Sequence, residues 1–430
     1  MVLTWRAAAL AAATVLAAVI AASWWAVLIG VALLIAVIGL DLALCPSPSR
    51  VYVRRSGDTS VRLGEQATTK LTVTNTGRKT LRGLVRNAWV PSAGARNGVS
   101  TMIIPARQRR TAALAMRPTR RGDRHAGPVV IRAVGPLGIA GRQTQHLAPW
   151  TVRVLPPFTA RKHLPSRLAR LRELDGRSTI LQRGQGTEFD SLREYVPGDD
   201  VRSIDWRSTA RSSTVVVRTW RPERDRHVLI VLDSGRTSAG RVGDQPKLDH
   251  AMDAALLLAA LASRAGDRVD LLIFDREVRA SVLRKATAEV LPSFVNAMAD
   301  IEPRLVEADH RRMVTEILQR VSQRSLVVIL TGLDAAAISE GLTPVLAPVR
   351  RKHKIVVAAV SDPRVDELVA RRGDAAEVYA AAAAEADRAR RGKTASGLRD
   401  LGLSVVQAPP NTFAPDLADH YLALKKAGQL

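Results

Sequence analysis

The sequence predicts an α/β domain with a doubly wound parallel sheet, preceded by a small β-sandwich and an N-terminal transmembrane helical hairpin. Three observations support this prediction: an uncharged apolar stretch over residues 7–40, short alternating runs over 51–157, and apolar strands that alternate with helical segments after residue 224. We place the hairpin at residues 1–45, the β-sandwich at 50–157, a basic linker with a distinctive motif at 160–223, and the α/β domain at 224–430.

The composition limits the class of protein. The chain has 430 residues, enough for about three domains, and its 47% hydrophobic and 24% charged residues are typical of globular proteins. One cysteine cannot form an internal disulfide or a Cys-rich zinc site. The formal charge of +24 favours contact with polyanions, either nucleic acid or anionic lipid, although 4% aromatic residues leave few base-stacking surfaces.

Residues 7–40 contain no charged side chain. One membrane span needs about 20 apolar residues, so this stretch is too long for one span and long enough for two short ones. Trp24 and Trp25 lie in its middle, and tryptophan favours the membrane–water interface, as at the tip of a hairpin. We therefore expect spans over about 2–22 and 26–44, and a multi-pass protein of the cell membrane.

Basic residues flank the hairpin. Arg6 precedes it, and Arg50, Arg54 and Arg55 follow it. The positive-inside rule then places both ends of the hairpin, and the soluble domains after it, in the cytoplasm. The alternative is a cleavable signal peptide cut near residues 21–23, although a second apolar stretch follows that point at once.

The next region has the pattern of short strands. Residues 67–75 alternate in polarity, with Leu71 and Val73 on one face, and a turn at 75–77 follows. Further strands are expected, without helices between them, at 81–90, 111–116, 127–134 and 152–155, as in a small β-sandwich. Two roles are open for an arginine cluster in this region, a solvated face or a patch held against anionic lipid: Arg107, Arg109, Arg110, Arg117, Arg120, Arg121 and Arg124.

The most distinctive motif runs over residues 184–211. Six acids interleave with arginines, and Pro197-Gly198 forces a turn between its two halves. These charges could pair with one another and fix a loop, dock a partner protein, or bind a divalent ion, although the nearby arginines compensate the carboxylates that an ion needs.

We propose as partner-binding residues Asp199, Asp200, Arg202, Asp205, Trp206 and Arg207. Within this set, Asp205 and Trp206 are expected to be structural, since a tryptophan buries a large apolar area. Asp199 and Asp200 are expected to contact the partner.

This motif closely resembles the signature of the bacterial domain of unknown function 58 family, and the resemblance extends over most of the chain. It implies a membrane hairpin, a β module, the motif, and then a von Willebrand factor A-like domain. Family members are often associated with MoxR-type AAA+ ATPases, so the resemblance also implies a partner of that kind.

Acidic residues follow four of the expected parallel strands: Asp233, Asp275, Asp334 and Asp362. In a doubly wound sheet, ligands bind beyond the carboxyl ends of the strands, where the strand order reverses. The first strand, at residues 227–233, is apolar throughout, as expected for a strand buried on both faces.

The loop after that strand resembles the Asp-x-Ser-x-Ser metal site of A-like domains. Asp233 and Thr237 match, Gly235 removes one hydroxyl ligand, and Arg236 adds a positive charge. Alternatively, Asp233 caps a helix, or Arg236 takes the place of the cation.

A second part of that site is also altered. Thr331 is present, but Gly332 stands where an acid is expected, and Asp334 follows two residues later. Mg²⁺ needs about six oxygen ligands. We therefore expect Asp233, Thr237, Thr331 and Asp334 to form a degenerate site with weak or absent Mg²⁺ binding, and no other cofactor.

These observations predict a non-enzymatic, membrane-anchored scaffold whose cytoplasmic A-like domain binds a protein partner, with a MoxR-type AAA+ ATPase implied and membrane lipid as a further contact. No nucleophile and base can be paired from the sequence, and the eight histidines have no metal-ligand spacing. Two alternatives stay open. A basic, membrane-bound nucleic-acid-binding protein would suit the charge but lacks a reader motif, and a metal-dependent hydrolase would use the acid clusters.

Overall fold

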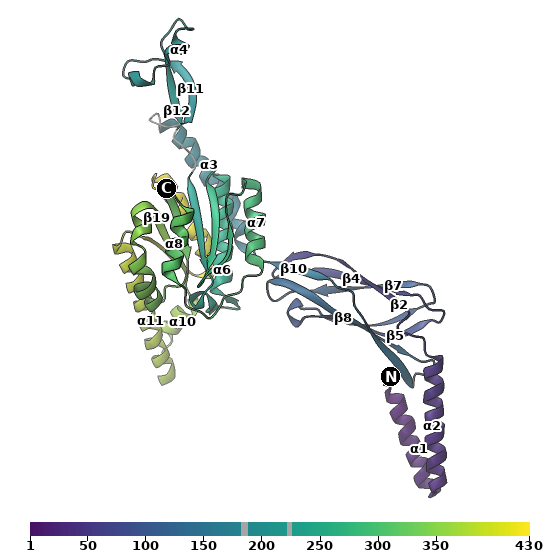
Figure 1. Cartoon of the computed structure of the whole chain (residues 1–430). Helices are drawn as coiled ribbons and strands as arrows, with labels where there is room; N and C mark the ends of the chain where they lie inside the picture. Colours follow the sequence, from purple (N-terminus) through teal and green to yellow (C-terminus); the bar gives the residue numbers. More distant parts are fainter. Residues whose placement is uncertain (182–187, 222–225) are drawn as a thin grey trace. The chain divides into compact units, whose positions relative to one another are not determined.

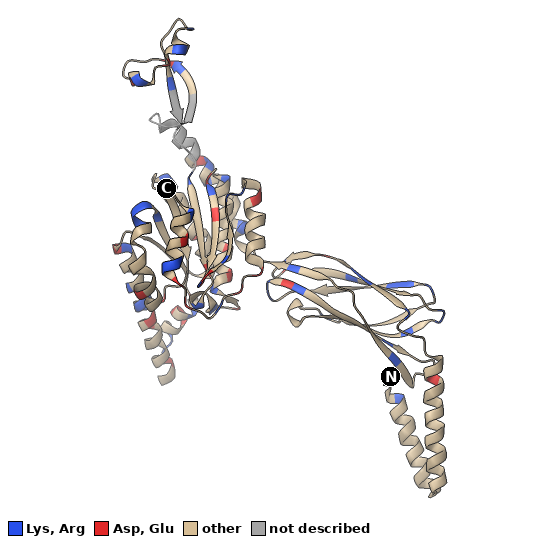
Figure 2. Cartoon of the chain, viewed as in Figure 1, with Lys and Arg blue, Asp and Glu red and all other residues tan. Residues whose placement is uncertain are grey.

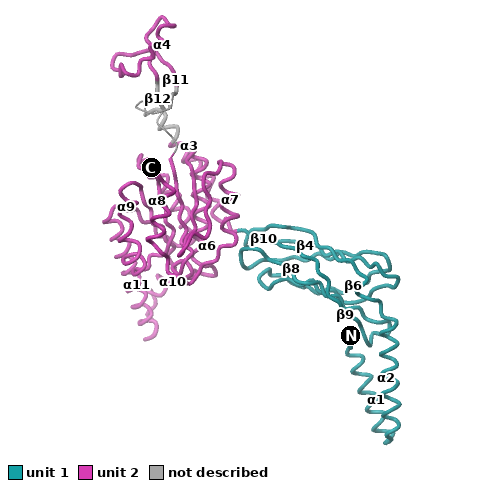
Figure 3. Tube along the Cα trace, viewed as in Figure 1, with its two compact units in different colours: residues 1–155 teal, residues 156–430 magenta. Residues whose placement is uncertain are grey.

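The computed structural model describes residues 1–181, 188–221 and 226–430 (Figure 1). The chain folds into two compact units, Met1–Leu155 and Pro156–Leu430 (Figure 3). Helices and sheets form both units, which confirms the prediction of a mixed α/β protein. The first four residues of the distinctive motif, 184–187, lie outside the described residues.

Two apolar helices open the first unit, α1 (Trp5–Ala21) and α2 (Trp24–Leu44). α2 has 21 residues and is long and apolar enough to cross a membrane. α1 has 17 residues, and at 1.5 Å per residue it covers about 26 Å, less than the roughly 30 Å of a hydrocarbon core. The structure therefore supports one candidate span among the described residues, and the expected multi-pass arrangement is not supported.

The first helix is shorter than expected because the chain before it joins a sheet. Val2–Leu3 form a short strand, β1, which pairs with Gly141 and Ala140. Residues 2 and 3 are thus removed from the helix that the sequence predicted from residue 2.

Two antiparallel sheets follow the helices. One contains, in this order, β2 (Val51–Gly57), β4 (Ala67–Asn75) and β7 (Arg109–Met116). The other has seven strands: β1, β3 (Ser60–Arg62), β5 (Leu81–Trp89), β6 (Val99–Ile104), β8 (Gly122–Val134), β9 (Ala140–His146) and β10 (Thr151–Leu155). Its pairs are antiparallel except for β3 with β10, which is parallel. The strands predicted at 67–75, 81–90, 111–116, 127–134 and 152–155 are all present.

The two sheets share one hydrophobic core. Leu71 and Val73 from the three-stranded sheet meet Val85 and Ile131 from the larger one, and each is at most 1% exposed. The alternation in residues 67–75 therefore identified the buried face of β4 correctly.

The second unit begins with the 3-10 turn η2 (Thr159–His163) and helix α3 (Leu164–Leu181). An antiparallel pair follows, β11 (Glu188–Glu194) with β12 (Val216–Arg221), and the turn η3 (Val201–Ser203) and helix α4 (Trp206–Thr209) lie between the two strands in sequence. We call residues 188–221 the arm.

A six-stranded sheet forms the centre of the rest of this unit. Its strands are, in order of pairing, β17 (Val278–Val282), β16 (Arg268–Phe274), β13 (His227–Asp233), β18 (Ser325–Leu330), β19 (Lys354–Val360) and β20 (Ser404–Ala408). β17 is antiparallel and the others are parallel. Since β13 pairs with both β16 and β18, the chain extends the sheet in both directions from β13, and every residue of β13 is buried as predicted.

Helices pack on the strands of this sheet (Figure 1). The helices of this region are α5 (Arg236–Ala239), α6 (Lys247–Arg264), α7 (Thr287–Ala299), α8 (His310–Arg320), α9 (Ala347–Lys352), α10 (Pro363–Ala370), α11 (Ala375–Asp400) and α12 (Pro410–Lys426). α6 and α12 pack on each other and on β19, while side chains of α8, α9 and α11 share one core with Leu229, Val327 and Val357 of the strands. A 3-10 turn, η5 (Thr343–Val345), comes shortly before α9.

Candidate functional site

Three oxygen-bearing side chains meet at the carboxyl ends of β13 and β18. Asp233 ends β13, Thr237 lies in α5, and Thr331 follows β18. Both hydroxyls donate to the same carboxylate oxygen, Asp233 Oδ2, at 2.5 Å from Thr237 and 2.6 Å from Thr331. The two hydroxyl oxygens are 3.3 Å apart. The structure thus brings together three of the four residues expected at the metal site.

The backbone explains why a serine is missing from this loop. The N–H of Gly235 donates to Asp233 Oδ1 at 2.7 Å. A Cβ on Gly235 would lie 2.9 Å from the carbonyl oxygen of Val306, which is closer than real Cβ contacts. Glycine therefore lets the loop pass against residue 306, and a serine hydroxyl cannot be added without moving backbone.

The fourth expected residue, Asp334, forms no hydrogen bond with the other three in the described part of the chain. Its Oδ2 and the Cβ of Thr237 would each lie 3.1 Å from a Cβ on Gly332, so it lies at the same edge. Within the described ranges, no group of three His, Cys, Asp or Glu side chains is placed to hold a metal ion. One carboxylate and two hydroxyls are about half of the oxygens that Mg²⁺ takes, so these residues do not fit a firmly held ion.

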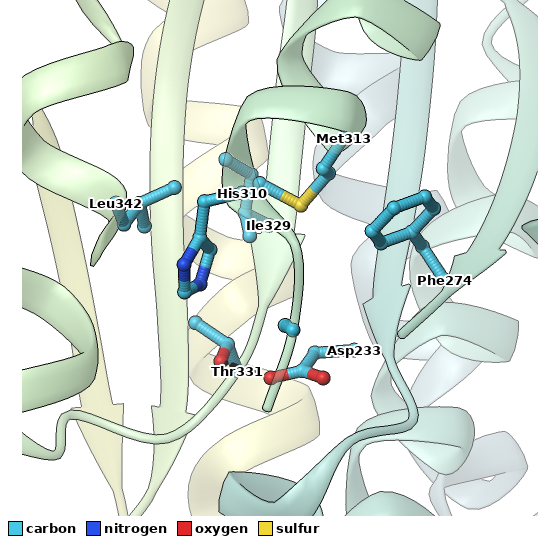
Figure 4. Close-up of a pocket in the computed structure, with 8 residues that line it drawn as sticks. Asp233, Phe274, His310, Met313, Ile329, Thr331 and Leu342 are labelled. Atoms are coloured by element: carbon cyan, nitrogen blue, oxygen red, sulfur yellow. Dashed lines mark hydrogen bonds between the residues drawn. The ribbon is translucent and has the colours of Figure 1, made fainter. Parts of the chain in front are cut away.

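Apolar side chains close the space beside Asp233. Figure 4 shows His310 from α8 directed toward Thr331 and Asp233, with Phe274, Met313 and Leu342 around them. The space that they line does not admit a water molecule. Burial lowers the pKa of His310, and nearby carboxylates, Asp233 first, oppose that shift. The ring is packed tightly, because a Cβ on Gly341 would lie 2.6 Å from its Nδ1.

The cations near the carboxyl ends of β13 and β18 are not arranged as the sequence suggested for Arg236. Arg236 does not take the place of a metal, because its Nε donates to Glu307 at 2.7 Å and its side chain is half exposed. Instead Lys247, at the start of α6, lies over Gly240, and burial lowers its pKa while Asp334 opposes the shift. No spacing pattern in the sequence indicated Lys247, since its position depends on how α6 packs.

The motif residues lie in the arm, where their carboxylates hold local structure. Asp199 pairs with Arg193 Nη2 at 2.5 Å and accepts the N–H of Val196 at 3.0 Å. Asp200 caps η3 by accepting the N–H of Arg202 at 3.0 Å. These hydrogen bonds give both acids a local structural role, and their contact with a partner stays a prediction.

Asp205 is structural, as expected. It is buried, caps α4 by accepting the N–H of Ser208 at 3.0 Å, and binds Arg218 of β12. The Ser208 N–H, followed by the Arg218 guanidinium, lowers the pKa of Asp205. Its N–H also donates to the carbonyl of Val216, so this residue fastens the middle of the motif to β12.

Trp206 is not buried, contrary to our expectation. It is the first residue of the four-residue helix α4, and 68% of it is exposed. Arg202 and Arg207 are exposed as well.

Trp206 is one of several large apolar residues on the surface of the arm. Among the side chains of the arm that the structure describes, the others are Leu192, Val196, Val201 and Val215, which are 42%, 55%, 62% and 39% exposed. The prediction focused on the charged residues of the motif and missed these four.

Comparison with known proteins shows a similarity to one family. A family model, described as protein of unknown function DUF58, matches residues 191–391, from β11 into α11. This match covers less than half of the 430-residue chain, so residues 191–391 are similar to that family. The resemblance of the motif to this family is thereby confirmed. The DUF58 description assigns no activity.

Curated relatives are similar in part of the chain. Uncharacterized proteins of Mycobacterium bovis and of two strains of Mycobacterium tuberculosis are each 27% identical over 187 residues, which are 43% of this chain. The chain spans 58% of the length of these relatives.

Solved structures are similar at a low level. The CARDB domain of the PF1109 protein of Pyrococcus furiosus is 16% identical, covers 24% of this chain and 91% of its own, and has a TM-score of 0.19. The YadV chaperone is 19% identical, covers 24% of this chain and 52% of its own, and has a TM-score of 0.16. Scores of this size carry no conclusion about fold or function.

Proposed function

We propose that this DUF58 chain is a non-enzymatic, membrane-anchored scaffold that docks a protein partner through its arm. The observation that carries the proposal is the exposure of large apolar side chains on the described part of the arm, with Trp206 and Val201 the most exposed. Tryptophan is enriched among the residues that dominate binding at protein interfaces.

The construction of the arm favours docking over self-packing. An isolated pair of strands is marginally stable in water, so its uncovered apolar residues gain by meeting another surface. Its charges already hold local structure, through Arg193 with Asp199 and Arg218 with Asp205. The apolar residues are then the part of the motif that is free for a partner.

The remaining parts of the proposal rest on finer assignments. The strand order around β13 supports a von Willebrand factor A-like, doubly wound domain, and the shared core of the two earlier sheets supports a β-sandwich. α2 would cross the membrane, with α1 as the shorter leg of a hairpin, and Arg6 and Arg50 favour a cytoplasmic location for the soluble part. The partner is proposed, from the family resemblance, to be a MoxR-type AAA+ ATPase.

The test is a binding measurement between the detergent-solubilised chain and a MoxR-type AAA+ ATPase from the same genome. Trp206→Ala and Val201→Ala should each weaken binding by about tenfold or more, the usual effect of losing an anchor residue. Tyr379→Ala is the matched control, because Tyr379 on α11 is 78% exposed. Equal binding by all three variants would reject the arm as the docking surface.

A further inference from the structure

The positive charge of the chain is concentrated in its first unit. Residues 1–155 contain 21 of the 64 Lys and Arg residues but 4 of the 40 acids, so they carry +17 of the total +24 (Figure 2). The remaining 275 residues carry +7. A net positive charge of this density attracts anionic partners to the unit that contains α1 and α2.

The four acids of this unit do not neutralise the end of the β module that joins the helices. Asp58 follows β2, which starts just after the helices at Val51 and runs away from them, and Asp123 pairs with Arg153 near the start of β8. Glu65 precedes β4, whose first residue, Ala67, is paired with Met116 at that same distant end. Three of the four acids thus lie at the opposite end from the helices.

The fourth acid, Asp41 in α2, is buried and hydrogen-bonded to the backbone. It is 0% exposed and accepts three backbone N–H groups at 2.8 Å each, from Leu137, Ile139 and Ala140. These bonds hold the loop between β8 and β9 against the end of the helix. Asp41 therefore offers no exposed negative charge where the helices meet the β module.

Exposed cations surround this junction. Lys79 Nζ donates to the carbonyl of Leu44 at 3.2 Å, and Arg6 Nη1 donates to the carbonyl of Leu137 at 3.2 Å. Arg142 pairs with Ala133, whose carbonyl accepts the Cys45 thiol at 3.6 Å. Each of these three cations therefore lies beside an end of α1 or α2.

A second loop adds further cations at the same end. Asn75 Nδ2 bridges the carbonyls of Lys79 and Ile104, at 2.9 and 3.0 Å, and so holds the turn at 76–80 beside the turn at 105–108. Arg78 and Arg107 occupy these turns, and Arg109 pairs with Thr74 next to them. We call the six exposed cations the collar: Arg6, Arg78, Lys79, Arg107, Arg109 and Arg142.

The collar differs from the arginine cluster that the sequence suggested. β7 has eight residues, so it separates its two ends by about 27 Å. Arg107 and Arg109 lie at the helix end, whereas Arg117 Nε donates to Gly64 and Arg124 Nη1 donates to Ser92 at the opposite end. The seven arginines therefore form two groups, and one of them contributes to the collar.

We propose that the collar binds the phosphate groups of anionic phospholipids. This inference rests on the proposed membrane anchoring of α2, which would bring the collar to the level of the lipid headgroups. Exposed Lys and Arg side chains without nearby exposed acids match the negative surface of the cytoplasmic leaflet, and each such charge strengthens attraction by roughly fivefold. The lipid surface would fix the β module at the membrane in addition to the helices.

The test compares two triple variants of the full chain purified in detergent. Arg78→Gln/Arg107→Gln/Arg109→Gln removes three exposed collar charges whose side chains form no hydrogen bond with the residues that the structure describes. Lys70→Gln/Arg96→Gln/Arg120→Gln removes three exposed charges elsewhere in the β module and gives the same net charge. Binding of short-chain phosphatidylglycerol and of short-chain phosphatidylcholine is measured by titration for both variants and for the wild type.

The wild type and the control variant should prefer phosphatidylglycerol, and the collar variant should bind it about tenfold or more weakly. An equal loss of phosphatidylglycerol binding in the two variants would attribute the binding to total charge and reject the collar as the site. An undiminished preference for phosphatidylglycerol in the collar variant would also reject it. Inorganic phosphate that displaces the lipid at matched concentration would also overturn it. Resistance of the wild type to carbonate extraction from membranes is scored separately, because its failure rejects the anchor itself.

Discussion

Arg218 Nε and Nη2 each lie 2.8 Å from the same oxygen of Asp205, Oδ2. This contact joins β12 to the cap of α4, while the adjacent Trp206 projects to the surface. Neighbouring residues of one motif therefore have separable roles, one in holding the arm together and one in offering a surface.

Asp205→Ala should loosen the arm, because it removes the cap of α4 and the partner of Arg218 together. Amide hydrogen exchange within residues 188–221 should speed up in this variant. Trp206→Ala should leave exchange unchanged, since the ring is exposed. Faster amide exchange in Trp206→Ala, or an unchanged exchange rate in Asp205→Ala, would contradict this division of roles.

Metal binding at Asp233 should be weak or absent. Titration of the purified chain with Mg²⁺ or Mn²⁺ should give no binding in the low micromolar range, because Asp233 Oδ2 is already satisfied by two hydroxyls. Restoring the missing hydroxyl with Gly235→Ser should lower stability and create no site, since its Cβ would meet the Val306 carbonyl at 2.9 Å. Tight binding that Asp233→Ala abolishes would show this expectation to be wrong.

A buried charge network at the start of the sheet should make stability depend on pH. Burial would raise the pKa of Asp270, but hydrogen bonds from His227, Arg268 and the Arg284 N–H outweigh it and lower the pKa to about 2. Asp270 is fully buried, 2.9 Å from His227 Nε2 and 2.5 Å from Arg268 Nη2. Relative to the unfolded value of 3.8, this shift stabilises the fold by about 2 kcal/mol.

The direction of this pH dependence follows from the protons that the folded and unfolded chains bind. Between pH 3.8 and 2 the unfolded chain binds a proton that the folded chain does not, so this stabilisation is complete above 3.8 and is lost as the pH falls toward 2. Asp270→Asn should therefore speed exchange of β13 amides at pH 7 and lose its difference from the wild type near pH 2. Glu340→Gln, at an exposed acid, is the control and should match the wild type at both pH values.

The proposed topology predicts a cytoplasmic C-terminus. A reporter that is active only in the cytoplasm, fused after Leu430, should be active, because Arg6, Arg50 and Arg54 flank the apolar helices. Alkaline phosphatase fused at the same position should be inactive. Strong phosphatase activity would reject the proposed orientation.

Local patterns in the sequence predicted much of the secondary structure. The alternation in residues 67–75 located β4 and its buried face, and the apolar run at 227–233 located a fully buried β13. Both patterns show which side chains of a segment face the core, and this depends only on residues close together in the sequence. Asp233, Thr237 and Thr331 were predicted from the resemblance of their loops to the metal site of A-like domains, and the structure brings them together.

Contacts between distant parts of the chain decided the rest. Val2–Leu3 pair with residues 140–141 and shorten α1, and Arg236 turns to Glu307 instead of Asp233. By itself, the sequence determined the similarity of residues 191–391 to the DUF58 family, the apolar helices and the total charge of +24. The tertiary structure alone decided that Trp206 is exposed and that cations gather where the helices meet the β module, because both depend on which segments pack together, and side-chain periodicity carries no information about that choice.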